Sequence, residues 1–534
     1  MAMRREWSRL FCGMSDRRQK PAFVNAVPEC VRALALCAHN RDNIQYTCHC
    51  KREGGGFLQG CGPAGDTLET GTQKGATTME HQVRDMTSGK PLHLITAFSV
   101  PLLFGNILQQ MYNFVDTLVV GRGVSMDVLA AVGLTGSLNF LVLGFIIGLS
   151  QGVGILCSQY FGSREYAQLR KSVTMSFYLN FSTGALLTVL SMVSARQLLV
   201  WMNTPAELMA DAWLYINVIF GGILISLAYN FLSGILRALG NSRDPLIAMI
   251  IAFIINTVLD VALVMGLGWG VLGAAAATVS AQLFSAIYCF VCVREIGFMK
   301  LEKKDWEWNG ALFRKSFVLS LPVALMNSIT ALGVIFMQIA INGFGAVYIA
   351  AYSVASKIII IFEQLDVSFG TGAGTFAGQN LGAGKPGRIR EGIHQVNLLL
   401  IGVNLAIFGL MLVAGRPLIG LMVGDEPAVI EAACQCIRFL CFFLMFLGTL
   451  WIYRTSLQSM SDTFWPMLSG VLEFAARTIA LLILPKLIGF YGVLSAEVSA
   501  WILAALMLVI VYRRRIRILE AECAEKGRDL SAVC

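Results

Sequence analysis

Two stretches of this chain share one pattern of small residues: GVGILCSQYFG at positions 152–162 and GAGTFAGQNLG at positions 372–382. Their glycines and the glutamine recur at the same spacings, and Pro245 with Pro466 and Arg170 with Arg390 keep nearly the same offset. A repeat of about 220 residues indicates two homologous halves. No Lys-Ser or Lys-Thr follows either stretch, so we interpret the glycines as helix-interface positions and not as nucleotide-binding loops.

Composition sets the class of protein in which these halves belong. Of the 534 residues, 56% are hydrophobic and only 14% are charged, whereas soluble domains carry about 25% charged residues. The apolar residues form long blocks of the length that crosses a bilayer as a helix, about 20 residues. The alternating ten-residue segments of an outer-membrane barrel are absent from the sequence. The chain is therefore predicted to be an all-α integral membrane protein.

Hydropathy from residue 91 onward predicts twelve transmembrane helices, six in each half. Because six is an even number, both halves have the same orientation and form two pseudo-symmetric lobes related by an axis along the membrane normal. The expected spans are 92–120, 128–160, 172–195, 208–238, 245–268, 271–293, 316–343, 346–381, 392–415, 427–455, 466–488 and 492–512.

Basic residues predict which way the helices run. One set of alternate loops carries nineteen Lys and Arg, and the other carries only Arg122, Arg196, Arg416 and Lys486. Cytoplasmic loops hold the excess of basic residues, so both termini are expected in the cytoplasm and the net charge of +8 is not a sign of nucleic-acid binding. The basic set is Arg164, Arg170, Lys171, Arg237, Arg243, Arg294, Lys300, Lys303, Lys304, Arg314, Lys315, Lys385, Arg388, Arg390, Arg454, Arg513, Arg514, Arg515 and Arg517.

The chain divides into five predicted segments. The first has a mixed composition unlike the rest, and we interpret it as a disordered extension or as sequence upstream of the true start. Its cysteines and the others do not form a disulfide framework or a zinc motif. The segments are an extension at 1–90, an N lobe at 91–293, a cytoplasmic inter-lobe loop at 294–315, a C lobe at 316–513 and a cytoplasmic tail at 514–534.

Polar side chains within the predicted spans of the N lobe are the candidates for ion binding. A charged group at a helix centre in a bilayer costs about 2.5–3.5 kcal/mol, so each one needs a partner or a role. Asp116 and Asp260 offer carboxylates, Asn256 lies one turn before Asp260 on the same helical face, and Thr278 offers a hydroxyl. Such a set suits Na⁺ or a shared proton. Tyr215 is a weaker fifth candidate.

The second half departs from this pattern. The position equivalent to Asn256 is Arg477, a fixed positive charge that would repel a cation, and Glu473 four residues earlier is predicted to pair with it. Coupling is therefore expected in the N lobe. Glu363 and Asp366 are weak candidates for binding a cationic substrate, with a network involving Lys357 on the same helix as the alternative.

From residue 90 to the C-terminal helix, the chain resembles the multidrug and toxic compound extrusion (MATE) family. The pieces that carry the resemblance lie in order across both halves. They are PLLFGNILQQMYNFVD at 101–116, LAAVG at 129–133, RALGNS at 237–242, Asn256-x3-Asp260, GAAAAT at 273–278 and GQNLGAG at 378–384.

This resemblance implies a secondary antiporter that exports small organic, often cationic, compounds while Na⁺ or H⁺ enters. It also implies that Asp116, Asn256, Asp260 and Thr278 form the cation site. We expect a monomer in the cell (inner, cytoplasmic) membrane that contacts lipid and small-molecule substrates, without cofactor, catalytic residues or nucleic acid. The alternative is a flippase for lipid-linked sugars, whose cavities typically carry several Arg or Lys. A membrane enzyme is disfavoured, because polar clusters of His, Ser or acids at an interface are not visible.

Overall fold

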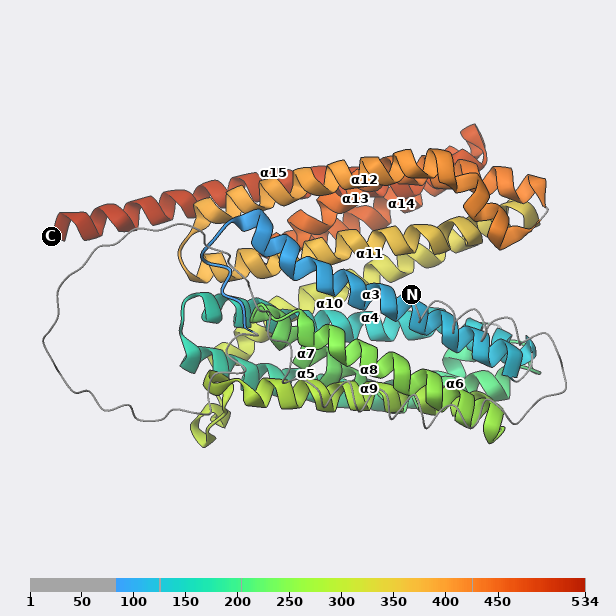
Figure 1. The fold of residues 1–534 in the computed structure, drawn as a ribbon, viewed down its shortest axis with the longest axis horizontal. Helices are drawn as coiled ribbons and strands as arrows, with labels where there is room; N and C mark the ends of the chain where they lie inside the picture. The colour runs from blue at the N-terminus through green and yellow to red at the C-terminus, as the bar shows by residue number, and fades with distance from the viewer. Residues whose placement is uncertain (1–82, 124–125, 203, 425, 534) are drawn as a thin grey trace, which may run out of the picture. The chain divides into compact units, whose positions relative to one another are not determined.

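Helices account for nearly all of the chain that the computed structural model describes, which is residues 83–123, 126–202, 204–424 and 426–533 (Figure 1). The predictions for residues 1–82, including those for their cysteines, lie outside these ranges. In the first half the helices are α3 Pro91–Gly123, α4 Met126–Gly162, α5 Tyr166–Trp201, α6 Met209–Gly221, α7 Ile223–Ala238, α8 Arg243–Asp260 and α9 Gly270–Glu295. In the second half they are α10 Gly310–Asn342, α11 Ala346–Gly382, α12 Pro386–Val423, α13 Pro427–Ser459, α14 Phe464–Ile488 and α15 Phe490–Val533.

The number of spans agrees with the sequence prediction. Eleven of the described helices are long and apolar enough to cross a membrane, and α6 with α7 forms a twelfth span if the pair, bent by 44°, is taken as one. Gly221 and Gly222 lie at this bend. The all-α, two-lobe membrane fold is confirmed.

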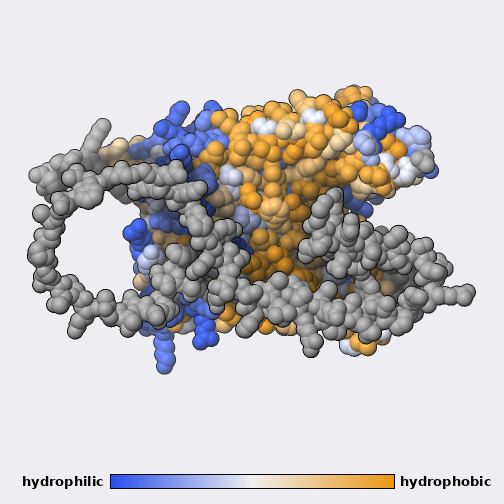
Figure 2. Space-filling model, in the orientation of Figure 1, coloured by the Kyte–Doolittle hydropathy of each residue, from blue (hydrophilic) through white to orange (hydrophobic). Residues whose placement is uncertain are grey.

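The outer faces of the helices are apolar, as lipid contact requires. Val193 of α5 and Val413 and Leu421 of α12 keep more than three-quarters of their surface exposed. Figure 2 shows a broad hydrophobic band over the middle of the molecule, with hydrophilic residues gathered toward its ends. Such residues would be unfavourable in water, whereas a bilayer core is as apolar as the side chains.

We call one end of the bundle the basic end. It carries the loops at 163–165, 239–242, 296–309, 383–385 and 460–463, which connect the helices on the side where the sequence places its excess of Lys and Arg. The long inter-lobe loop there contains two short 3₁₀ helices, η2 Gly297–Met299 and η3 Lys303–Trp306. Asp305 of η3 is buried and forms an ion pair of 3.0 Å with Arg170 of α5, which fixes this loop against the N lobe.

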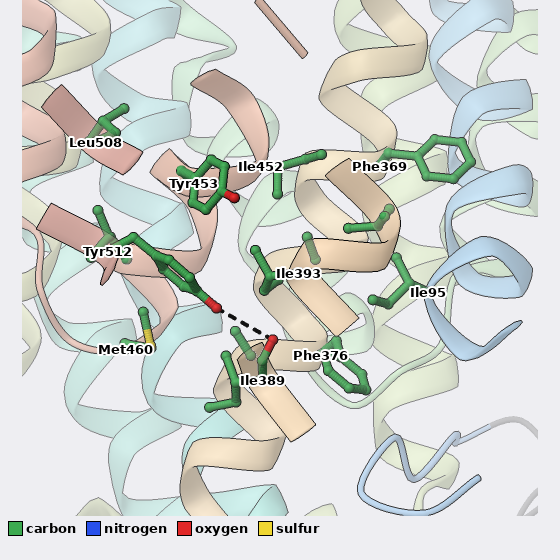
Figure 3. Close-up of a cluster of buried hydrophobic side chains, with 14 of the residues drawn as sticks. Ile95, Phe369, Phe376, Ile389, Ile393, Ile452, Tyr453, Met460, Leu508 and Tyr512 are labelled. Atoms are coloured by element: carbon green, nitrogen blue, oxygen red, sulfur yellow. Dashed lines mark hydrogen bonds between the residues drawn. The ribbon is translucent and has the colours of Figure 1, made fainter. Parts of the chain in front are cut away.

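The first helix joins the two halves. Its opening turns bury Ile95 and Phe98 in a hydrophobic cluster that otherwise belongs to α11, α12, α13 and α15. Figure 3 shows Ile95 beside Phe376 and Ile393, with the Tyr512 hydroxyl donating a hydrogen bond to the Ile389 carbonyl. Beyond Pro101, the remainder of α3 continues toward Asp116 and lies along α8. One helix thus contacts both lobes.

The buried charges of the C lobe differ from the predicted pairing. Arg477 does not bind Glu473: it forms two hydrogen bonds, of 2.7 and 2.8 Å, with Glu497 of α15. Glu473 pairs instead with Arg454 of α13. The intrahelical prediction was wrong because the neighbouring helices offer each group a partner across the interface, where a planar guanidinium can bind a carboxylate with two hydrogen bonds.

Two positions assigned from the sequence also need correction. Arg454 was counted among the loop residues, but it lies within α13 and is only 3% exposed. Arg438, a second basic residue of α13, is exposed. Without Arg454, the basic set still holds eighteen Lys and Arg, against four in the other set of loops. The segment predicted as a tail from residue 514 continues α15 as helix.

Candidate functional site

Four helices of the N lobe bring the predicted ion-binding residues toward one region. Asp116 comes from α3, Asn256 and Asp260 come from the last turns of α8, and Thr278 comes from α9. Tyr215 of α6 joins them. Asp116 and Asp260 lie close enough for the charge of each to act on the other, and the charges of both act on Tyr215. The five residues named from the sequence are thus neighbours in space.

Several polar atoms of this cluster are buried and have no hydrogen-bond partner among the residues that the structure describes. Asn256 and Asp260 have no exposed surface. No hydrogen-bond partner is recorded for Oδ1 of Asp116, for either carboxylate oxygen of Asp260, for either amide atom of Asn256 or for Oγ1 of Thr278. Native structures satisfy most buried polar groups, because each unsatisfied one costs about 1–3 kcal/mol. Such a concentration of unsatisfied oxygens fits a cation, a proton or water.

A cavity of about 360 Å³ opens next to this cluster. Asp116, Thr278 and Tyr215 line it, whereas Asp260 and Asn256 are not among its lining residues. The described residues that line it include no Lys or Arg, so none of them places a fixed positive charge beside the carboxylate of Asp116. A positively charged ion or organic cation entering the cavity would therefore be attracted to Asp116. We call this space the N-lobe cavity.

The backbone next to Asp260 departs from a regular α-helix. Directly after Asp260, the α-helix changes to a π-helical turn, η1 Val261–Gly266. Short π-helical segments are rare and occur frequently at functional sites, since they widen the helix and redirect the side chains beside them. The chain then reverses through Gly268 and Gly270, both with positive φ, into α9. This turn returns the chain so that α9 can present Thr278 beside α8.

A second cavity, of about 250 Å³, lies between the lobes. Asn106, Gln151 and Arg237 line it from the N lobe, and Thr371 and Gln458 line it from the C lobe. It contains one basic residue and no acid among its lining residues. Its wall shares Ile147 with the N-lobe cavity, so the two spaces adjoin at this side chain. We call it the central cavity.

Glycines let the two repeated stretches touch at the basic end. A Cβ atom on Gly162 would overlap the carbonyl oxygen of Gln379, and one on Gly382 would overlap the carbonyl oxygen of Gln159. The ends of α4 and α11 therefore cross backbone against backbone, which only glycine permits. This confirms the interpretation of the repeated glycines as helix-interface positions.

The two glutamines of the repeat complete this crossing in a symmetric way. Gln159 of the N lobe donates hydrogen bonds to the carbonyl of Ser459 (2.7 Å) and the hydroxyl of Ser461 (2.8 Å) in the C lobe. Gln379 of the C lobe donates to the carbonyl of Ala238 (3.0 Å) in the N lobe. Each lobe thus holds a helix end or loop of the other, and the two lobes are in direct contact at the basic end.

The two candidates for substrate binding in the C lobe occupy different environments. Glu363 is half-buried, and it feels the charges of Arg477 and Glu497. Asp366 has no exposed surface and does not line the central or the N-lobe cavity. None of the ion pairs among the described residues joins Lys357 to Glu363 or Asp366. In this conformation a substrate in the two cavities would not touch Asp366.

Several polar residues of these sites were not singled out from the sequence. Tyr112, Asn139 and Gln282 line the N-lobe cavity, and Asn404 contacts Asp366. A polar residue in an apolar span was the available signal, but amides and tyrosines are common at helix interfaces, and periodicity does not distinguish one facing a cavity from one facing a neighbouring helix. Gln159 and Gln379 were visible as an equivalent pair in the repeat.

Comparison with known proteins gives consistent results. The MatE family model matches twice, at residues 101–262 and 322–482, once in each half. The chain is 26% identical over 428 residues to the probable multidrug resistance protein YpnP of Bacillus subtilis (strain 168), covering 78% of this chain and 91% of that protein. It is 23% identical to the multidrug export protein MepA of Staphylococcus aureus (strain NCTC 8325 / PS 47), covering 80% and 95%.

The fold matches solved structures over nearly their whole length. A crystal structure of MATE in complex with MaL6 superposes with a TM-score of 0.76 at 20% sequence identity. The superposition covers 82% of this chain and 99% of that one. The part of the chain that matches therefore has the complete fold of a known transporter family.

Proposed function

Since this chain belongs to the MatE family of transporters, we propose that it is an efflux antiporter that exports small organic, mainly cationic, compounds while Na⁺ or H⁺ moves inward. Its relatives in Bacillus and Staphylococcus carry the names of multidrug resistance and multidrug export proteins, and multidrug efflux is the transport activity that they support. The antiport mechanism, the coupling ion and the orientation, with both termini in the cytoplasm, are parts of our proposal.

The observation that carries the proposal is the group of unpartnered oxygens around Asp116 and Asp260. Carboxylates buried in a span are costly unless they are neutralised. Asn256 and Thr278 would supply two further oxygens to a Na⁺ ion, or the two carboxyl groups would share a proton. In both cases, the arriving ion removes negative charge from the wall of the N-lobe cavity. A cationic substrate held there by Asp116 would then be released.

The energetics allow such an exchange. One positive charge that moves inward through about 150 mV releases about 3.5 kcal/mol, which corresponds to a substrate gradient of a few hundredfold. This value holds for a neutral substrate; one-for-one export of a monovalent cation cancels the electrical term, so the chemical ion gradient or a second inward ion must then drive the exchange. The contact between the lobes at Gly162 and Gly382 would supply the closed side that alternating access needs.

Efflux measured in everted membrane vesicles tests the proposal. Vesicles that contain the protein should accumulate a fluorescent organic cation, such as ethidium, when a proton or a sodium gradient is imposed. Each gradient is applied separately, which identifies the ion. Control vesicles from cells without the protein set the background. Accumulation driven by ATP alone, with both gradients collapsed, would contradict the proposal.

The flippase alternative makes a different prediction. A cavity that holds a pyrophosphate group should contain several basic side chains, and Arg237 is the one such residue among those that line the central cavity. The same vesicles, loaded with a fluorescent lipid-linked pyrophosphate, should therefore show no movement of the probe. Movement of that lipid without transport of organic cations would favour the flippase.

A further inference from the structure

Asp366 is a buried carboxyl group of the C lobe that takes no part in the ion pairs described above. Asp366 of α11 has no exposed surface. It accepts one hydrogen bond at Oδ1, from the amide nitrogen of Asn404 at 3.0 Å, whereas its Oδ2 has no partner. None of the ion pairs recorded among the described residues involves Asp366.

Three helices build the surroundings of this carboxyl group. Asn404 of α12 also donates to the Leu444 carbonyl of α13, at 3.3 Å, and its own Oδ1 is buried without a partner. Gly448 brings α13 against the site: a Cβ there would lie 2.7 Å from Oδ1 of Asp366 and 2.9 Å from Nδ2 of Asn404. A larger residue at this position would push against both side chains, and the backbone of α13 encloses the site on that side.

The charged groups around Asp366 do not neutralise it. Glu363, one turn earlier on α11, is the ionisable group whose charge acts on it, and it is also acidic. The basic groups nearby are engaged, because Arg454 of α13 pairs with Glu473 of α14 and Arg477 of α14 pairs with Glu497 of α15. From α12 and α13, the contacts to Asp366 come from a neutral amide and a glycine. Among the described residues of the C-lobe interior, Glu363 and Asp366 are thus two acids that neither of these ion pairs includes.

An ionised Asp366 would be unfavourable here. A buried charge with a single neutral hydrogen-bond donor lacks the solvation that water provides. A hard metal cation prefers a shell of several oxygens, and the atoms that could supply one here are Oδ2 of Asp366, Oδ1 of Asn404 and the Leu444 carbonyl. A proton needs no shell: it bonds to Oδ2 and removes the charge.

We propose that Asp366, held by Asn404 and enclosed by Gly448, is a reversible proton-binding site of the C lobe. The proton comes from water, forms an O–H bond at Oδ2 and returns to water when the site opens. Half-buried Glu363, three residues earlier on the same helix, is the neighbouring acid whose charge acts on this site. This inference rests on the proposed function, ion-coupled antiport. It adds an ion-binding position in the C lobe to the one proposed in the N lobe.

The position of Asp366 gives protonation a mechanical consequence. Ser368, two residues further along α11, accepts a hydrogen bond of 3.0 Å from Asn106 of α3. Helix α3 also carries Asp116, ten residues after Asn106. An ionised Asp366 would draw water or a hydrogen-bond donor into the interface of α11, α12 and α13. This would alter the packing of α11, which contacts α3 and α4 of the N lobe and ends at the basic end.

Infrared spectroscopy of the purified protein in lipid tests the proposal without transport. A protonated carboxyl group absorbs at a frequency distinct from that of a carboxylate, so pH-difference spectra count buried protonated acids. We expect the wild-type spectrum at neutral pH to contain the absorption of one carboxyl group that is missing in Asp366→Asn. Glu431→Gln, in an exposed residue at the start of α13, is the control and should retain the absorption.

A second variant keeps the carboxyl group and removes its donor. Asn404→Ala should raise the midpoint of the titration by about one pH unit, a tenfold gain in proton affinity, because a donor to the charged form is lost. An unchanged absorption in Asp366→Asn or an unmoved midpoint in Asn404→Ala would overturn the proposal, as would control of the absorption by Na⁺ at constant pH. Because no substrate or gradient is present, failure of drug efflux in the vesicles would count against the proposed function alone.

Discussion

The buried charges of this protein differ in whether an opposite charge pairs with them. That difference predicts how strongly the removal of one charge destabilises the fold. Glu473 and Arg454 are both almost fully buried and pair with each other. Glu473→Gln leaves the Arg454 charge uncompensated, so we expect the free energy of unfolding to fall by about 3–5 kcal/mol. Thermal unfolding of the detergent-solubilised protein, followed by tryptophan fluorescence, measures the change.

The matched control removes an acid from an exposed pair. Glu520→Gln breaks the contact with Arg390, whose side chain is 65% exposed, and such pairs are worth about 0–1 kcal/mol. Its unfolding midpoint should remain close to that of the wild type. Equal losses in the two variants would show that the pairing of Glu473 with Arg454 has no special weight.

At the residue scale, the sequence identified charges but not their partners. Asp116, Asn256 and Asp260 stood out because a polar group in an apolar span is visible without a structure. The partners of Glu473 and Arg477 were predicted wrongly, since the spacing of four residues describes one isolated helix. Their actual partners lie on neighbouring helices, whose rotation a single sequence does not specify. Asn404 remained unnoticed for the same reason.

The crossing of α4 and α11 is the element on which closure of the basic end depends. Gly162→Leu would place a side chain where the Gln379 carbonyl lies, so the two helix ends could no longer meet. We expect ion-driven efflux to fall at least tenfold while the protein is still inserted, because the state closed at the basic end becomes unfavourable. Efflux in everted vesicles, normalised to the amount of protein, measures this effect.

A glycine on α12 provides the control for the helix crossing. Gly409 is exposed, and no atom lies within 4 Å of the position that its Cβ would take. Gly409→Leu should therefore transport as the wild type does. Wild-type efflux in Gly162→Leu would contradict the idea that transport passes through this closed state.

Elements were more predictable than individual contacts. Hydropathy over about 20 residues averages out errors at single positions, so the twelve spans and the repeat were found. The bend between α6 and α7, the π-helical turn after Asp260 and the helical continuation of α15 were not predicted. These features depend on local hydrogen bonding and on packing against neighbours, which hydropathy does not report.

Across the whole molecule, one cysteine tests the proposed orientation. Cys523 lies on the exposed end of α15, whereas the other cysteines within the described residues, from Cys157 to Cys441, are buried. A membrane-impermeant maleimide should label Cys523 in everted vesicles and not in intact cells. Cys523→Ser is labelled under both conditions as well. The labelling that this variant loses is the labelling of Cys523, and any that remains comes from other cysteines. Labelling that Cys523→Ser abolishes in intact cells would place this terminus outside.

The lobes share a scaffold, but their ionisable groups have diverged. Among the described residues, the N lobe gathers Asp116 and Asp260 beside a cavity that no basic side chain lines, and the C lobe combines two ion pairs with Asp366, which belongs to none of them. Because of this asymmetry, we expect the N-lobe carboxylates to be indispensable for coupling, whereas the C-lobe carboxyl group should modulate it.

Ion-driven efflux by Asp116→Asn and Asp260→Asn in everted vesicles tests the central claim most directly. Both substitutions preserve the shape of the side chain and remove its charge, so the protein should insert normally. We predict that each variant accumulates the organic cation no faster than vesicles without the protein, under whichever gradient drives the wild type. Undiminished gradient-driven accumulation in both variants would contradict the assignment of coupling to the N-lobe site.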